Sequence, residues 1–131
     1  MKKIISAALT ANILIISFSL LIIFHLSVLL RIAPYDIVWG GRIDNVTSML
    51  IYEGTAVIIL LLFIVIIALK THSVKTKRLN TAAGYAVWIV FGYFILGIAG
   101  NIASASYLEK VIFTPVTIAL ALLTFRLAIE K

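Results

Sequence analysis

The stretch that decides the fold is residues 4–30, which read IISAALTANILIISFSLLIIFHLSVLL. It contains no Asp, Glu, Lys or Arg, and its most polar side chains are Asn12 and His25. About 20 consecutive apolar residues are enough to cross the hydrocarbon core of a bilayer. A secretory signal peptide has a shorter apolar core, roughly 7–15 residues, followed by a small-residue cleavage site. Because residues 4–30 show neither feature, they predict a membrane-spanning helix.

The rest of the chain repeats this pattern. Further apolar runs occupy residues 47–69, 81–103 and 111–129. The chain of 131 residues is 63% hydrophobic with a mean hydropathy of +1.21, whereas a soluble domain is usually about half apolar. The connections hold proline, glycine and charged residues, which interrupt helices. The sequence therefore predicts an all-α, membrane-spanning four-helix bundle, with residues 1–131 forming a single transmembrane domain.

The basic residues predict the orientation of this bundle. Eight of them fall on the side of the two termini and three on the other side; the eight are Lys2, Lys3, Lys70, Lys75, Lys77, Arg78, Arg126 and Lys131, and the three are Arg31, Arg42 and Lys110. Because basic residues stay on the cytoplasmic side, we expect both termini in the cytoplasm. The chain rich in Ile and Lys and free of Cys is typical of bacteria, so we expect the bacterial cytoplasmic membrane.

Several function classes are excluded by composition. The absence of Cys removes disulfides, thiolate metal sites and cysteine nucleophiles. The only two histidines, His25 and His72, fall on opposite sides of the membrane, and metal sites need three or four ligands. The net charge of +6 comes from residues beside the apolar runs, so it indicates topology rather than nucleic-acid binding. We expect no metal, no cofactor and no assigned catalytic residue.

One acidic residue lies within an apolar run. Glu53 lies about six residues into the second run, so roughly 9 Å below the membrane surface at 1.5 Å per residue. An ionisable residue at such a depth is a functional-site hypothesis by default. His25 and Asn101 lie at a similar depth in the first and third runs. Since lipid penalises polar side chains that face it, we expect these three residues to turn toward one another.

The connection between the first two runs adds polar groups above this layer. Arg42 is expected to pair with Glu53 or Asp36, since arginine makes forked contacts with carboxylates. Trp39 and Tyr52 are expected to line the walls of the resulting outward-facing pocket. The candidate ligand-binding residues are Glu53, His25, Asn101, Arg42, Asp36, Tyr52 and Trp39.

Short segments that contain several of these residues carry a family resemblance. They are Pro34 to Arg42 (PYDIVWGGR), Tyr52-Glu53, Gly100-Asn101, Glu109-Lys110 and Phe113 to Pro115. Together they resemble a group of small bacterial membrane proteins with four helices. The resemblance implies the same fold and membrane location, and it implies no reaction.

Three kinds of function remain open at this point. The first is a protein that binds or transports a small polar or amphiphilic molecule, or protons, in the pocket. The second is a structural or accessory membrane subunit whose polar layer only specifies helix packing. The third is a lipid-modifying or isomerising enzyme with Glu53 and His25 as acid and base. The expected partners are membrane lipids, a small molecule, and a second copy or another membrane protein.

Overall fold

The computed structural model describes residues 5–71 and 77–130. Its main elements are α1 (Ala7–Leu29), α2 (Val46–Thr71), α3 (Lys77–Ala103) and α4 (Thr114–Ala128), with a π-helical turn, η3 (Glu109–Phe113), directly before α4. Two short 3-10 turns, η1 (Tyr35–Ile37) and η2 (Trp39–Gly41), lie between α1 and α2. Within the described residues, four helices are long and apolar enough to cross a membrane, counting η3 and α4 as one. The prediction of an all-α bundle with four helices of membrane-spanning length and apolarity is confirmed.

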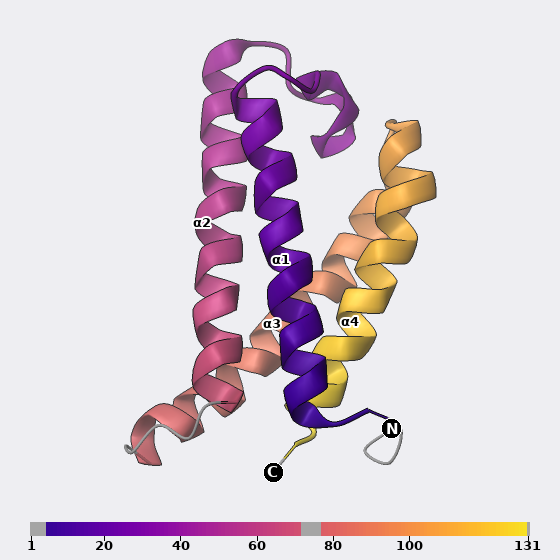
Figure 1. Ribbon diagram of the computed structural model, residues 1–131. Coiled ribbons are helices and arrows are strands. Elements are labelled where there is room, and N and C mark those ends of the chain that lie inside the picture. Colours follow the sequence, from indigo (N-terminus) through magenta and orange to yellow (C-terminus); the bar gives the residue numbers. More distant parts are fainter. Residues whose placement is uncertain (1–4, 72–76, 131) are drawn as a thin grey trace.

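The four helices form two antiparallel pairs, α1 with α2 and α3 with α4 (Figure 1). At one end, which we call the terminal end, the pairs meet near both chain termini. At the opposite end, the loop end, the pairs diverge, and the α1–α2 connection reaches across toward α4. This arrangement places residues 31–45 between the two helix pairs.

The core is small and aromatic at its centre. Phe18, Phe63 and Phe94 come from α1, α2 and α3, and the rings of Phe18 and Phe94 stack with centroids 5.7 Å apart. Large apolar side chains elsewhere on the helices are exposed, for example Ile58 at 68% and Leu96 at 75%. Exposed apolar side chains in such number on long apolar helices fit contact with the lipid of a membrane. The bundle thus holds together around its centre and offers its outside to lipid.

A second, smaller core attaches the α1–α2 connection to its own helix pair. Val28 of α1, Val38 and Ile43 of the connection, and Met49 of α2 are buried together. The connection is therefore a packed part of the fold, and its side chains occupy defined positions at the loop end.

The helix ends differ from the predicted ones for local reasons. The predicted start of the first helix, residue 4, lies outside the described residues; α1 begins at Ala7, where the Ser6 hydroxyl accepts a hydrogen bond from the Leu9 N–H at 3.2 Å. The third helix begins at Lys77 rather than at residue 81. Of the residues used to predict orientation, Lys2, Lys3, Lys75 and Lys131 lie outside the described residues, as does His72. The side on which the termini lie stays a prediction.

The fourth helix begins earlier than predicted. The sequence suggests that it starts at residue 111, but helical backbone already precedes the π turn that begins at Glu109. In this turn the Thr114 N–H bonds to the Glu109 carbonyl, five residues back. Pro115 follows at once, and proline lacks an N–H and crowds the carbonyl four residues earlier. A wider turn before it relieves this conflict, and π turns are frequent at functional sites.

Arg126 closes the terminal end. The residue is buried at 4% exposure, its Nε donates to the Ile5 carbonyl at 3.1 Å, and its Nη1 donates to Glu130 Oε2 at 2.7 Å. The Lys70 ammonium donates to the Glu130 carbonyl at 2.7 Å. We call Ile5, Lys70, Arg126 and Glu130 the terminal clasp, because they join the start of α1, the end of α2 and the end of α4.

Candidate functional site

Glu53 is fully buried between the first helix pair and the α1–α2 connection. Its Oε2 lies 2.6 Å from Nδ1 of His25 on α1, and its Oε1 accepts a hydrogen bond from the Trp39 indole N–H at 2.7 Å. One carboxylate therefore joins α1, α2 and the connection. A carboxylate with 0% exposure requires such partners, since an unpaired buried charge is very costly.

The contact between His25 Nδ1 and Glu53 Oε2 leaves the second ring nitrogen of His25, Nε2, outside this pair. A neutral imidazole carries one donor and one acceptor nitrogen, and an imidazolium carries two donors. His25 also lines the cavity described below, so its ring is a polar group of that cavity as well as a partner of Glu53.

The backbone at Trp39 is unusual. Its φ is +54°, and the next two residues, Gly40 and Gly41, have φ of +70° and +69°. The left-handed region is easily reached by glycine but costs other residues roughly 1–2 kcal/mol. The conformation turns the Trp39 indole toward Glu53, where the hydrogen bond compensates for the strain. Strain of this kind concentrates at functional sites.

A second hydrogen-bond network ties the connection to the other helix pair. Glu109 Oε2 accepts a hydrogen bond from the Gly40 N–H at 2.8 Å and another from the Ser104 hydroxyl. The Ser106 hydroxyl donates to the Ile37 carbonyl at 2.6 Å. Residues 37–40 are therefore bonded to the α3–α4 turn on one side, while Trp39 is bonded to Glu53 on the other.

Asn101 and Thr117 join α3 to α4. The Asn101 amide donates to the Thr117 hydroxyl at 2.9 Å, and that hydroxyl donates to the Phe113 carbonyl at 2.6 Å. The approach is close here: a Cβ on Gly97 would lie 3.2 Å from Thr117 Cγ2.

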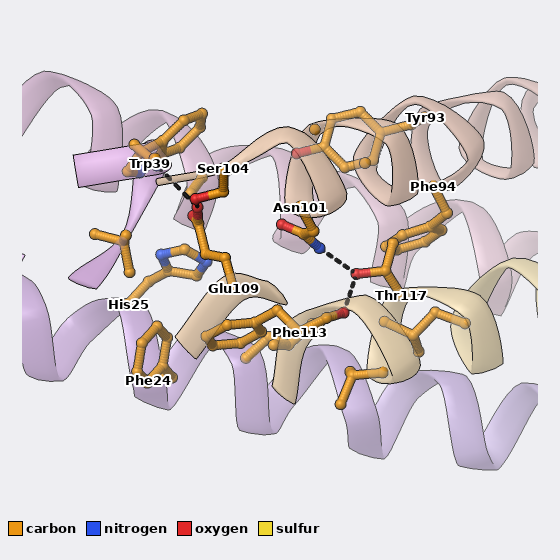
Figure 2. Close-up of a pocket in the computed structure, with 18 of the residues that line it drawn as sticks. Phe24, His25, Trp39, Tyr93, Phe94, Asn101, Ser104, Glu109, Phe113 and Thr117 are labelled. Atoms are coloured by element: carbon orange, nitrogen blue, oxygen red, sulfur yellow. Dashed lines mark hydrogen bonds between the residues drawn. The ribbon is translucent and has the colours of Figure 1, made fainter. Parts of the chain in front are cut away.

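Between the two helix pairs lies a cavity of about 380 Å³. Figure 2 shows Trp39, His25, Ser104 and Glu109 at one end of it, and Tyr93 and Phe94 at the other. Its lining is mostly apolar, and the apolar residues are Leu21, Phe24, Val38, Ala56, Leu60, Tyr93, Phe94, Phe113, Val116 and Leu120. Gly97, Gly100 and Ala103 of α3 also line it. The cavity thus has a mostly apolar body that also holds Asn101 and Thr117, and a loop end with His25, Ser104 and Glu109.

The predicted site residues divide into two groups. His25, Trp39, Arg42 and Asn101 line the cavity. Glu53, Asp36 and Tyr52 are not among the residues that line it: Glu53 lies behind His25 and Trp39, Asp36 is exposed, and the Tyr52 ring packs on that of Trp39 with centroids 5.2 Å apart.

The predicted pairing of Arg42 with Glu53 or Asp36 is wrong. Both oxygens of Glu53 are engaged by His25 and Trp39, and Arg42 is exposed and forms no ion pair with any residue in 5–71 or 77–130. The left-handed backbone at Trp39 decides this outcome, because it brings the indole rather than the guanidinium to the carboxylate.

Sequence reasoning missed the role of the α3–α4 turn. It names Glu109 only among the segments that carry the family resemblance and gives Ser104 and Ser106 no function, yet these three residues hold the connection over the cavity. The available signal was the spacing Ser104-x-Ser106-x-x-Glu109. Two serine hydroxyls stand just before a helix, and the Glu109 carboxylate follows Ser106 by three residues. This spacing resembles a helix capping box.

No family model, no curated protein and no solved structure matches this chain. Among the described residues, no group of three or more His, Cys, Asp or Glu side chains could hold a metal ion. The function must therefore be argued from the cavity itself.

Proposed function

We propose that this protein binds a small amphiphilic molecule in the cavity between its two helix pairs. One observation carries the proposal: a cavity of about 380 Å³ has a mostly apolar lining, with His25, Ser104 and Glu109 together at its loop end. An amphiphile has the matching division, with an apolar tail and a polar head.

The size and chemistry of the cavity support this proposal. Ligand pockets occupy about 300–1,000 Å³ and are mostly apolar, with a few polar groups that fix orientation. Packed interiors hold few voids larger than a water molecule, so a cavity of this volume is a property of the helix arrangement rather than a packing defect. His25, Asn101, Ser104 and Glu109 supply donors and acceptors at the cavity wall.

The predicted orientation adds a direction. If the termini lie in the cytoplasm, the loop end and its cavity lie in the outer half of the membrane, while the terminal clasp closes the cytoplasmic half. The ligand would then enter from the outer leaflet or the outside. Binding is the minimal form of this function, and transport would require the terminal clasp to open.

A structural subunit is the second candidate, and the buried Glu53 favours it. Both of its oxygens are engaged and it does not line the cavity, so it acts in packing under either function. The same observation disfavours an enzyme with Glu53 as its acid, because that carboxylate does not reach the cavity.

Photolabelling tests the proposal. The probe is dodecanoyl lysophosphatidylcholine with a diazirine in its tail, added to the protein in maltoside detergent. We expect labelled peptides from the cavity walls around Phe94 and Phe113, and competition by the same lipid without diazirine. Labelling spread evenly over all lipid-facing helix surfaces, with no competition, would contradict ligand binding in the cavity.

Two glycines of α3 provide a matched pair of variants. Gly100 lines the cavity, Gly92 does not, and a Cβ on either would meet no atom within 4 Å. Gly100→Leu should fill part of the cavity with four carbon atoms and lower its labelling by about tenfold or more, since a single methylene already changes binding in an apolar pocket by about tenfold. Gly92→Leu should leave labelling unchanged. Equal labelling of both variants would favour the structural role.

A further inference from the structure

Two charged side chains at the loop end of the cavity are not paired. Glu109 and Arg42 both line the cavity, and neither forms an ion pair with another residue in the part of the chain that the structure describes. A charge beside an apolar cavity gains more from a partner than one in water does, because the surrounding dielectric is lower. Within the described residues no ion pair uses either charge, although the carboxylate of Glu109 also accepts a hydrogen bond from the α1–α2 connection.

Glu109 is positioned with one oxygen spare. Its Oε2 accepts hydrogen bonds from the Gly40 N–H and the Ser104 hydroxyl, and its Oε1 accepts none from a described residue. The side chain is half-buried. It is therefore fixed in place by one oxygen and presents a negative charge through the other.

Arg42 lies next to the same residue, Gly40. A Cβ on Gly40 would lie 3.5 Å from Arg42 Nε and 3.8 Å from the Ser104 hydroxyl oxygen, while the Gly40 N–H donates to Glu109 at 2.8 Å. The carboxylate and the guanidinium thus flank a single glycine at the polar end of the cavity. Opposite charges on two neighbours of one residue match a group that carries both signs.

We propose that the ligand is a single-chain amphiphile with a zwitterionic head. Its ammonium group binds Glu109, its phosphate or carboxylate binds Arg42, and its tail lies along Phe24, Phe94 and Phe113. This inference rests on the proposed ligand-binding function and names the class of ligand. The aromatic walls add to the match, since an aromatic ring face also attracts an ammonium group.

The same head chemistry is found in lysophospholipids and in small soluble zwitterions. The apolar body of the cavity favours a ligand with a tail, because burial of each CH₂ contributes about 0.8 kcal/mol. A soluble zwitterion such as phosphoethanolamine should therefore bind far more weakly than dodecanoyl lysophosphatidylethanolamine, which carries the same head.

The proposal is tested by measuring how well three amphiphiles compete with the photolabel for the cavity. Each has a single twelve-carbon chain, and they differ in the charge of the head. They are dodecanoyl lysophosphatidylethanolamine (zwitterionic), dodecanoyl lysophosphatidylglycerol (anionic) and dodecylamine (cationic); phosphoethanolamine is the head without a tail. We expect the zwitterionic lipid to compete about tenfold better than either singly charged one, the size expected for one charge-assisted hydrogen bond. Equal competition by the anionic lipid or by dodecylamine would overturn the inference.

Variants test which charged side chain binds which charged group of the ligand. Glu109→Gln keeps an amide oxygen for Gly40 and Ser104 and should weaken the zwitterionic lipid and dodecylamine, but not the anionic lipid. Arg42→Gln should weaken the zwitterionic and anionic lipids, but not dodecylamine. The controls are Asp36→Asn and Lys110→Gln, which remove exposed charges at the same end that are not among the residues lining the cavity. An equal effect of controls and test variants would contradict the assignment.

The outcomes distinguish the preference for a zwitterionic head from the proposed binding of an amphiphile in the cavity. If the photolabel stays sensitive to Gly100→Leu but head-group charge has no influence, the cavity binds amphiphiles and the zwitterionic preference is wrong. If no cavity labelling occurs, both fail. Should Glu109→Gln not fold, competition on the unmodified protein and on Arg42→Gln still decides the question.

Discussion

The two ends of this bundle hold the two helix pairs together in different ways. At the terminal end, the helix ends meet directly, and a buried arginine holds them through the terminal clasp. At the loop end, the helix pairs do not meet, and the connection between them bonds to Glu53 on one side and to Glu109 on the other. A bundle that is closed at one end and bridged at the other contains a cavity beside the bridge. The loop end is where function is expected, and the terminal end is where rigidity is expected.

The largest effect should come from breaking the bridge at Glu53. Glu53→Ala leaves the Trp39 indole and His25 without a partner and removes the compensation for the left-handed backbone at Trp39. Because removing one member of a buried pair costs about 3–5 kcal/mol, we expect a loss of about 3 kcal/mol in the free energy of unfolding. Unfolding in mixed dodecyl sulfate and maltoside micelles, followed by tryptophan fluorescence, measures it.

The control for this variant is Asp36→Ala, which removes an exposed carboxylate of the same connection. It should change the free energy of unfolding by less than about 0.5 kcal/mol, as surface substitutions do. Cavity labelling should fall in Glu53→Ala at concentrations where the protein is still folded. A loss below about 1 kcal/mol would show that Glu53 does not hold the bridge.

Arg126→Met should have the next largest effect, at the opposite end. Methionine keeps most of the packing volume but loses the bonds to the Ile5 carbonyl and to Glu130. We expect a loss of about 2 kcal/mol, since hydrogen bonds of charged groups contribute about 1.5–3 kcal/mol. Arg78→Met, at an exposed position of α3 near the same end, is the control.

The decisive measurement for Arg126→Met is its cavity labelling. If the two ends are independent, labelling stays unchanged while thermal stability falls. A parallel loss of labelling would mean that the terminal clasp also shapes the cavity, and the contrast between the two ends would not hold.

Gly97→Ala should have a smaller effect at the contact of α3 with α4. Its new Cβ would lie 3.2 Å from Thr117 Cγ2, and overpacking costs typically 1–3 kcal/mol. Offset by the better helix propensity of alanine, the net loss should be about 1 kcal/mol. Gly92→Ala meets no atom within 4 Å and should stabilise α3 by about 0.5–1 kcal/mol. Equal stability of the two variants would contradict the close approach at Gly97.

The sequence predicted the helices well because hydropathy adds over some 20 residues, so no single residue decides a span. It also grouped His25 with Glu53 by depth alone, and their side chains are in contact. Depth reasoning could not find the partner on the connection, since the left-handed φ of Trp39 has no local signature beyond the two glycines that follow. Depth reasoning therefore predicts Glu53 or Asp36 as the partner of Arg42, whereas the Trp39 indole takes the position beside Glu53.

The early start of the fourth helix and the role of the α3–α4 turn are not predicted, for a similar reason. Pro115 in an apolar run indicates a helix start, whereas here a π turn before it carries the helix further back. This extension brings Glu109 to the cavity. What the sequence could not supply in either case was a single unusual backbone conformation that redirects one side chain.

The smallest effect should come from the hydrogen bond between Asn101 and Thr117 on the second helix pair. Thr117→Val removes the acceptor of the Asn101 amide and the bond to the Phe113 carbonyl with little change in shape.

Thr124→Val is the matched control, because the Thr124 hydroxyl is buried and donates to the carbonyl of Leu120 four residues back. The difference between the two variants isolates the interhelical bond, which in membrane proteins averages about 0.6 kcal/mol. A double variant with Asn101→Ala completes the cycle, and a coupling of zero would show that this bond does not contribute and that packing holds α3 to α4. Since both side chains line the cavity, a measurable coupling would mean that the second pair is fixed independently of the bridge at Glu53, so a ligand would meet two preformed walls.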